Sequence, residues 1–520
     1  MMKKIFINSL FLLFGIMILV LSIRGITGNP TENSINSLGW KDDGPFELSP
    51  ERGRFALTFS LIEDKSFFFS VPIARFVTPD LGYKNGQYVS LFPPAISYLA
   101  VPGYIIGKYF GASQVGTFAV ISLFALINMF LIQKIAAKLG ASRLAGILAS
   151  LAFLFATPAF AYAVTLYQHH VSTFLILLSI YILVSTTGIL PLFFVWFLCA
   201  MAIPVDYTNL FLMFPIGIYA VLRFFYITTD TKKSFLHFRI LAPLTLIGII
   251  LPLAFFLWFN KASYGNPLQL SGTIPGVRDI DASGKPAPPT GADINNIEKY
   301  FNPELQQKSA VAFFQARNII NGLYEHILSA DRGIMYFTPV ILFGLVGLVV
   351  LYRRKNPFMP LLTGVILTNL LLYSMWGDPY GGWAFGSRYL IPGYAILAIA
   401  LAVGLDALKR YWIVLLLFLV VLAYSIGVNT VGALTTSANP PKTEVLALEK
   451  LSGRQEKYTF ERNIDYLKQS GSKSFAYNTW FKKYVSPLEY FWIIAGTITG
   501  IATIATIALA FSKPKYKVNK

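Results

Sequence analysis

Residues 91–110, LFPPAISYLAVPGYIIGKYF, decide how the rest of the chain is threaded. The stretch is apolar enough to pass for a membrane span. If it crossed the bilayer, Lys134, Lys138 and Arg143 would change sides and every later loop would be inverted. Because cytoplasmic loops are the ones that carry an excess of Lys and Arg, that threading is disfavoured. We therefore predict a helix that lies along or dips into the outer leaflet, helped by its three prolines.

The composition around this stretch is that of a membrane protein. Of the 520 residues, 55% are hydrophobic and 13% are charged, which is far from the composition of ordinary soluble domains. Apolar runs of the length needed to cross about 30 Å of hydrocarbon recur along the chain. No small-x-small cleavage site follows the first run, so we expect a retained anchor. The twelve predicted spans lie near 5–23, 114–133, 144–163, 171–186, 189–205, 208–226, 240–259, 333–352, 357–375, 389–405, 411–430 and 488–511.

The net charge of +18 has a definite place in this topology. The short connections on the inner side carry eighteen Lys and Arg against two acids, Asp230 and Asp406, whereas the outer segments 24–113 and 260–332 are neutral. This is the positive-inside pattern of a plasma or inner membrane protein with both termini in the cytoplasm. We expect no nucleic-acid partner. The single cysteine, Cys199, excludes internal disulfides and cysteine-cluster metal sites.

Function is expected on the outer face. The outer segments are long and mix acids, aromatic residues, glycine and proline, and long loops between elements usually carry function. No Walker sequence, HExxH, paired CxxC or GxSxG occurs. No cofactor is therefore indicated, and a divalent metal stays open. Because the outer face lacks ATP, an enzyme there would need a substrate that arrives already activated.

Several motifs occur in a fixed order after the first span. SPERGRFALTFSLIEDKSFF (49–68) contains carboxylate-x-x-Arg-aromatic-Ala, and 79–104 contains Asn-Gly-x-Tyr followed by a Pro-Pro helix. In these features the chain resembles the GT-C membrane glycosyltransferases, in particular the bacterial phospholipid-carrier-dependent enzymes that include aminoarabinose lipid A transferases and protein O-mannosyltransferases. The likeness continues through 155–174, 202–210, 264–270, 321–340 and 376–392.

The resemblance implies an all-α, GT-C-like polytopic fold of about twelve transmembrane helices, with juxtamembrane helices in long outer loops. It also implies transfer of a sugar from a polyprenyl-phosphate carrier to a hydroxyl or amine of an acceptor, whether lipid, glycan or protein. The alternative class is a multi-span transporter or lipid flippase. Transporters usually show internal repeats with helices broken at the midplane, whereas we find no repeat here and the polar residues gather at one face.

Glu51 occupies the place of the family's first catalytic acid, and the resemblance implies that it is the general base. The second acid of the family pair is replaced by Arg52, and Glu63, Asp64 or Asp206 are alternative bases. The competing interpretation is that Glu51 caps a helix that starts near Arg52, because an acid at a helix start is stabilised by the free amides.

Arg388 and Arg332 are the candidate phosphate ligands. Each stands at the outer end of a predicted span, where a guanidinium can hold a phosphate through two contacts. The competing interpretation for Arg388 is interfacial snorkelling or pairing with Asp378. The glycines of 376–388 would let this loop fold tightly against a headgroup and form one wall of the donor site.

The other candidate binding residues are His169, Asp206, Tyr83, Tyr88 and Lys84. His169 and His170 stand at the entrance of a span and point about 100° apart, so a shared task is not expected. Each histidine is equally well explained as an interfacial residue held by hydrogen bonds. The competing interpretation of Asp206 is that it pairs with a neighbouring cation. Tyr83 and Tyr88 line a sugar pocket or close a turn at Asn85–Gly86, and the turn is favoured for Asn85–Gly86. Phe92 stands where the family often carries lysine, and Lys84 is a candidate substitute.

These features suggest a division of the chain. We expect a GT-C-like catalytic membrane module at 1–260 that includes the outer loop 24–113, a second outer loop at 261–332, additional spans at 333–431 with the loop 376–388, an outer segment at 432–487, and a last span with a basic inner tail at 488–520. The charged segment 432–487 is interpreted as a solvated face in preference to an acceptor site.

Overall fold

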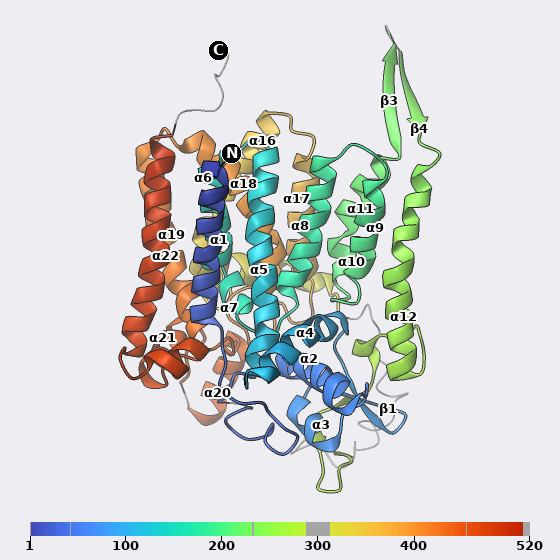
Figure 1. The fold of residues 1–520 in the computed structure, drawn as a ribbon, viewed down its shortest axis with the longest axis vertical. Coiled ribbons are helices and arrows are strands. Elements are labelled where there is room, and N and C mark those ends of the chain that lie inside the picture. The colour runs from blue at the N-terminus through green and yellow to red at the C-terminus, as the bar shows by residue number, and fades with distance from the viewer. Residues whose placement is uncertain (1, 42, 231–232, 288–312, 454, 513–520) are drawn as a thin grey trace.

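The computed structural model describes the chain apart from residues 1, 42, 231–232, 288–312, 454 and 513–520. Apolar helices run side by side in one bundle, and α1 begins at the end of the bundle where α22 finishes (Figure 1). The bundle helices are α1 (Met2–Ser22), α5 (Ser113–Lys138), α6 (Arg143–Phe155), α8 (His169–Ser185), α9 (Pro191–Met201), α10 (Asn209–Leu212), α11 (Phe214–Leu222), η2 (Ala242–Ile249) with α12 (Ile250–Tyr264), η6 (Pro339–Phe343) with α16 (Gly344–Arg353), α17 (Met359–Ser374), η7 (Arg388–Leu390) with α18 (Ile391–Leu408), α19 (Trp412–Leu434) and α22 (Pro487–Ala510).

The described helices coincide with the predicted spans. Five are long and apolar enough to cross a membrane: Ser113–Lys138, Ala242–Tyr264, Arg388–Leu408, Trp412–Leu434 and Pro487–Ala510. Seven shorter apolar helices, among them Leu10–Ser22 and Met359–Ser374, overlap the other seven predicted spans. The chain is therefore a membrane protein, while the full number of crossings stays a prediction.

One predicted span is shorter in the structure. The run predicted near 144–163 breaks after Phe155, where α6 ends, and residues Ala159–Ala163 form the separate short helix α7. Pro158 is the physical cause, because proline has no N–H to donate and disfavours helical geometry in the residue before it.

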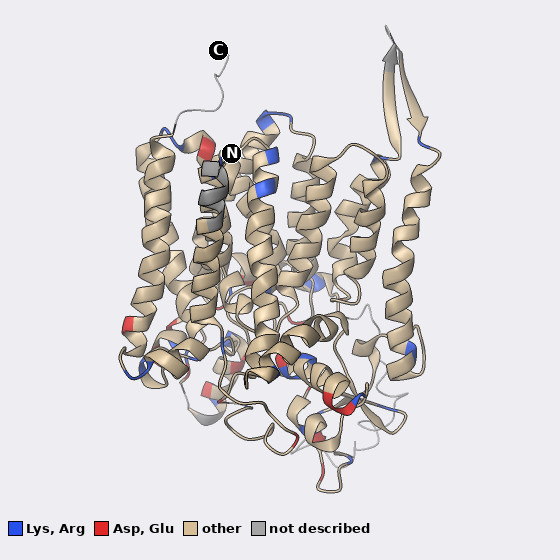
Figure 2. Ribbon diagram, viewed as in Figure 1, with Lys and Arg blue, Asp and Glu red and all other residues tan. Residues whose placement is uncertain are grey.

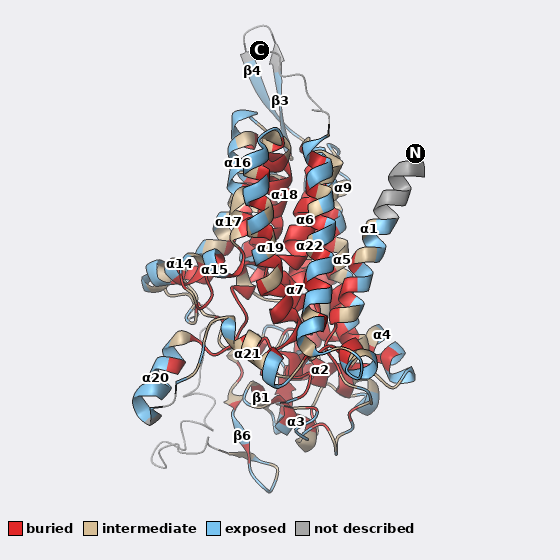
Figure 3. Ribbon diagram, turned by 90° about the vertical axis from the view of Figure 1, so that its left-hand side faces the viewer, coloured by how far each residue is buried: buried red, intermediate tan, exposed pale blue. Residues whose placement is uncertain are grey.

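The centre of the bundle is α18. Fifteen of its 18 residues are buried, and Figure 3 shows it enclosed by its neighbours. Small residues allow this packing, since a Cβ added to Gly347 of α16 would lie 1.7 Å from the carbonyl oxygen of Ala400. Such close approach lets dispersion hold helices together where lipid offers no hydrophobic driving force.

The opposite end of the bundle carries the elements of the first outer loop. These are α2 (Ser49–Phe59), the π-helical turn η1 (Ser60–Asp64), α3 (Val71–Val77), β1 (Leu81–Lys84), β2 (Gln87–Ser90) and α4 (Ala95–Tyr109). α4 lies beside α2 at this end (Figures 1 and 3) and is not among the helices long and apolar enough to span a membrane. It packs on α5, where a Cβ on Gly116 would lie 2.0 Å from the carbonyl oxygen of Gly103. Residues 91–110 thus lie outside the row of candidate spans, as predicted.

The helices fit the predicted all-α membrane fold, and a few short strands occur in addition. The described residues form three small sheets, β2-β1-β5 with β5 at Gly276–Val277, β3 (Phe225–Asp230) with β4 (Lys233–Phe238), and β6 (Asp279–Ile280) with β7 (Pro286–Ala287). The β3–β4 hairpin extends past the bundle (Figure 1), in the connection between α11 and η2. Its β-branched and aromatic residues are typical of strands.

The remaining described helices cover the end of the bundle that carries α2. They are η3 (Ser271–Thr273), η5 (Ala316–Asn318), α14 (Ile319–Ile327), α15 (Ile334–Phe337), α20 (Lys442–Ser452), α21 (Glu461–Gln469) and the π-helical η8 (Tyr477–Phe481). Figure 2 shows acids and bases mixed at this end, and mainly Lys and Arg at the other. The asymmetry is the one that the loop charges predict.

Candidate active site

Glu51 lies in the first turn of α2 and is completely buried. Its Oε2 accepts a hydrogen bond from the backbone N–H of Leu48 at 3.3 Å. Within the described residues, Oε1 has no hydrogen-bond partner. The carboxylate therefore caps the helix with one oxygen, as the competing interpretation predicted, and leaves the other oxygen without a partner among the described residues.

The surroundings of Glu51 favour its neutral form. Burial raises the pKa of Glu51 to about 7, and the nearby charge of Glu47 adds to the effect. Glu47 itself lies between two cations, with Arg24 Nη1 at 3.0 Å and Lys473 Nζ at 2.6 Å. Burial opposes its charge, but Lys473 and Arg24 more than offset this and lower the pKa of Glu47 to about 2. Glu51 is thus a carboxyl that gains and loses a proton near neutral pH.

Arg54 follows Glu51 by one turn of α2 and begins a buried polar chain. Its Nη2 donates to Gln168 Oε1 at 2.6 Å, and Gln168 Nε2 donates to Asp206 Oδ2 at 2.7 Å. Burial lowers the pKa of Arg54 to about 10, so it stays charged at neutral pH. Its guanidinium lies 5.0 Å from the centre of the Phe92 ring. Sequence reasoning placed Arg54 in a motif without assigning it a role.

Arg388 is a buried arginine with spare donors. Its Nη2 donates to the carbonyl of Gly381 at 2.6 Å, while Nε and Nη1 have no partner in the described part of the chain. The guanidinium lies 5.2 Å from the ring centre of Tyr167 and 5.5 Å from that of Tyr389. Among the described residues it forms no ion pair with Asp378, whose Oδ1 also has no hydrogen-bond partner there. Arg388 therefore has two N–H directions available for an anion.

Tyr167 brings these groups together. It stands in the loop between α7 and α8, and burial raises its pKa well above the ordinary value, with the charges of Glu51, Arg388 and Arg54 also acting on it. His169 stacks on the same ring at 5.8 Å. The loop before α8 thus joins α2 to the loop before α18, although these three segments lie far apart in the sequence.

Neighbouring His170 faces another way. One of its ring nitrogens, Nε2, lies 2.8 Å from the carbonyl oxygen of Ala159 and so ties α8 to α7. The two histidines have different surroundings, as their angular separation on a helix predicts.

Arg332 is fully engaged with protein oxygens. Its Nε donates to Tyr380 O, Nη1 to Asp331 O and Oδ1, and Nη2 to Gly382 O and Asn439 O, over 2.5–3.1 Å. All five N–H groups are used. Arg332 therefore holds the loop 376–388 in place, and this contact set favours a structural role over the phosphate contact we expected.

Lys84, Tyr83 and Tyr88 lie on the β1–β2 hairpin. Lys84 pairs with Gln87 across a two-residue turn at Asn85–Gly86, where both residues have positive φ, as the turn interpretation predicts. Lys84 Nζ donates to Gln269 Oε1 at 2.6 Å, and Tyr88 Oη donates to the Gly284 carbonyl at 2.9 Å. These hydrogen bonds run within the outer loops and not to Glu51 or Arg388.

Two of the alternative bases lie away from the buried cluster. Glu63 is exposed and pairs with Lys108 at 2.7 Å, and Asp64 beside it is also exposed. Asp206 does belong to the cluster, through Gln168. The described residues hold no group of three or more His, Cys, Asp or Glu side chains placed to bind a metal.

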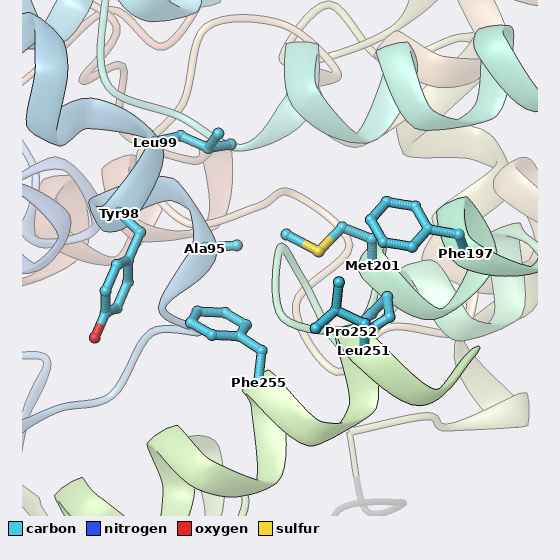
Figure 4. Close-up of a pocket in the computed structure, with 8 residues that line it drawn as sticks. All are labelled: Ala95, Tyr98, Leu99, Phe197, Met201, Leu251, Pro252 and Phe255. Atoms are coloured by element: carbon cyan, nitrogen blue, oxygen red, sulfur yellow. The ribbon is translucent and has the colours of Figure 1, made fainter. Parts of the chain in front are cut away.

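An apolar cavity of about 330 Å³ lies between α4, α9 and α12. Ala95, Tyr98 and Leu99 of α4 line it on one side, and Phe197 and Met201 of α9 with Leu251, Pro252 and Phe255 of α12 line it on the other (Figure 4). α4 begins three residues after Phe92, the ring over which Arg54 lies. Arg54 and the cavity are thus both adjacent to the start of α4.

Neither a family model nor a curated protein matches the sequence. Among solved structures, the chain is similar to ArnT from Cupriavidus metallidurans in the apo state, with 12% identity and a TM-score of 0.47 over 98% of this chain and 77% of that one. It is also similar to ArnT from the same organism bound to undecaprenyl phosphate, with 13% identity and a TM-score of 0.44 over 97% of this chain and 76% of that one. A third similar structure is the archaeal oligosaccharyltransferase AglB from Archaeoglobus fulgidus in complex with an inhibitory peptide and a dolichol-phosphate. The identity is 13% and the TM-score 0.39, over 99% of this chain and 57% of that one.

Proposed function

We propose that this chain is a membrane glycosyltransferase that moves a sugar from a polyprenyl-phosphate carrier to an acceptor on the outer face of the membrane. One observation carries the proposal. A buried carboxyl with a free oxygen, Glu51, lies in the same cluster as Arg388, a buried arginine whose Nε and Nη1 have no partner among the described residues. The cluster stands at the end of an apolar helix bundle, where a lipid phosphate would reach it.

The reaction uses each of these groups. The Glu51 carboxylate accepts the proton of the acceptor O–H or N–H, and the freed electron pair attacks the anomeric carbon of the donor sugar. The bond between that carbon and the phosphate oxygen breaks, and its electron pair stays on the phosphate. The N–H groups of Arg388 stabilise the charge that develops there. A pKa of about 7 suits Glu51 for this role, because a general base works best near the operating pH.

Arg54 and Asp206 support the site from the side. Gln168 links the two at 2.6 and 2.7 Å, which fixes the Arg54 guanidinium beside Tyr167. We assign Arg54 to the charge balance of the donor phosphate and His169 to the wall of the sugar pocket, through its stacking on Tyr167. Phe92, in the place of the family's lysine, supplies a ring under Arg54 instead of a charge.

The apolar cavity between α4, α9 and α12 supports a lipid-linked donor. Its lining is almost entirely apolar, which suits an isoprenoid chain, and Ala95 of the lining follows Phe92, the ring over which Arg54 lies, by three residues. The proposed site draws Glu51 and Arg54 from the module 1–260 and Arg388 from the loop 376–388. The catalytic unit therefore includes part of the segment 333–431.

A direct test is incubation of the purified protein with a panel of polyprenyl-phosphate sugars and acceptor extracts, with release of polyprenyl phosphate as the readout. We expect release with at least one donor, and release about 10²- to 10⁴-fold slower with the Glu51→Gln variant. A transporter or flippase would move labelled lipid across proteoliposomes without releasing polyprenyl phosphate. That outcome would overturn the proposal.

A further inference from the structure

We propose that a lysine-lined cavity at the start of α22 binds the headgroup of an anionic phospholipid. The cavity has a volume of about 590 Å³ and lies between α21 and the residues that follow η8. Lys468, Lys482 and Lys483 line it together with Asn478 and Ser486. We call this site the lysine cavity. It is separate from the buried cluster around Glu51 and plays no part in the proposed reaction.

The charge of the lysine cavity is uncompensated. Among the described residues, Lys468, Lys482 and Lys483 are all exposed and form no ion pair. The acid that follows them, Glu489, is occupied: its Oε2 accepts from the backbone N–H and the hydroxyl of Ser486, each at 2.8 Å. Three ammonium groups around one cavity are suited to a phosphate diester.

The position of the lysine cavity identifies a lipid as the source of that phosphate. α22 begins at Pro487, on the rim of the cavity, and runs from there as a candidate membrane span of 24 residues. Figure 1 shows α22 at the edge of the bundle with α21 at its foot. Along α22, Trp492, Ile493 and Ile504 are exposed by 63%, 52% and 65%. A lipid whose headgroup occupies the cavity would lay its acyl chains on this face.

Aromatic residues mark the same level. Trp480 is 56% exposed and Tyr484 is 83% exposed, and Tyr484 lines the lysine cavity. Tryptophan and tyrosine collect at the headgroup level of membranes, where an apolar ring meets a polar tip. Lysine stems likewise lie along apolar surface while their ammonium groups reach the headgroups. The cavity therefore combines the charge and the aromatic rim of an interfacial lipid site.

The test compares two variants of the full chain with the same loss of charge. The variant Lys482→Gln/Lys483→Gln removes two ammonium groups from the cavity, and the control Lys65→Gln/Lys450→Gln removes two exposed ones elsewhere. Binding of phosphatidylglycerol and of phosphatidylcholine is measured by titration into delipidated protein in neutral detergent. Thermal melting and gel filtration establish that both variants are folded. Competition with inorganic phosphate separates a lipid from a free anion.

We expect phosphatidylglycerol to bind the unaltered chain and the control alike, and to bind the cavity variant roughly 25-fold more weakly, roughly fivefold for each lysine. Phosphatidylcholine should bind weakly to all three. Equal weakening in the control would overturn the proposal, because the attraction would then be one of overall charge. Inorganic phosphate that displaces phosphatidylglycerol at equal concentration would also overturn it, since the cavity would then be a site for a free anion.

Discussion

The guanidinium of Arg388 lies 5.2 Å from the ring centre of Tyr167, and on the same ring, at 5.7 Å, lies the guanidinium of Arg54. The two arginines belong to segments more than 300 residues apart, and one aromatic side chain holds both. Like charges do not gather in a buried site without a reason. Arg54 is linked through Gln168 to Asp206, whereas Nε and Nη1 of Arg388 have no partner among the described residues, so that these nitrogens can donate to an anion.

Replacement of Glu51 by glutamine tests the base. Glutamine keeps the shape and can still accept from the Leu48 N–H, but it cannot take a proton, so turnover should fall by about 10²- to 10⁴-fold. Donor affinity and melting temperature should change little. Glu63→Gln is the matched control, because Glu63 is exposed and paired with Lys108. Near-normal transfer by a stable Glu51→Gln protein would move the base to Asp206.

The pH dependence follows from the same residue. Since Glu51 must be deprotonated to act and its pKa lies at about 7, kcat/KM should rise through pH 7 and level off above it. Stability should move the opposite way. The folded-state pKa lies above the ordinary 4.5, so the folded protein binds this proton more tightly, and the contribution of Glu51 to stability is lost as pH rises from about 4.5 to about 7. A rate profile with its midpoint near 4.5 would contradict the buried position of the carboxyl.

The two buried arginines should respond differently to lysine. Arg388→Lys keeps the charge but loses the planar fork, so activity and donor affinity should fall about tenfold or more while the protein stays folded. Arg332→Lys removes donors from five protein contacts and should instead lower stability, by about 1–3 kcal/mol. Activity assays and thermal melting on both variants distinguish the roles. Full activity of Arg388→Lys would remove Arg388 from the phosphate site.

Accessible tags can show whether residues 91–110 cross the membrane. A tag placed before Pro93 and one placed after Gly111 should both be accessible from the outer side, because α4 lies beside α2 and outside the row of candidate spans. Labelling of intact cells by a membrane-impermeant reagent reports the side. Opposite sides would make α4 a span and invert every later loop.

The sequence alone was enough for the plan of the membrane helices. Spans are dictated by local composition, because a backbone in hydrocarbon must satisfy its hydrogen bonds within its own segment, and the described helices fall where the apolar runs are. Local sequence was also enough to predict the turn at Asn85–Gly86 and to single out the motif that contains Glu51. The end of α6 before Pro158 could also have been predicted from the sequence, because a proline within an apolar run interrupts a helix.

Only the tertiary structure decided which charged residues lie together and which remain available. Arg332 and Arg388 have the same sequence signature, an arginine at the end of an apolar run, yet five carbonyl and carboxylate oxygens occupy the first and one carbonyl occupies the second. Lys473 belongs to the charged segment 432–487 that we interpreted as a solvated face, but its side chain is only 10% exposed and pairs at 2.6 Å with Glu47, which lies more than 400 residues earlier. The physical reason is that partners and burial are set by non-local packing. The sequence around a residue therefore does not predict which distant oxygen or aromatic ring contacts its side chain.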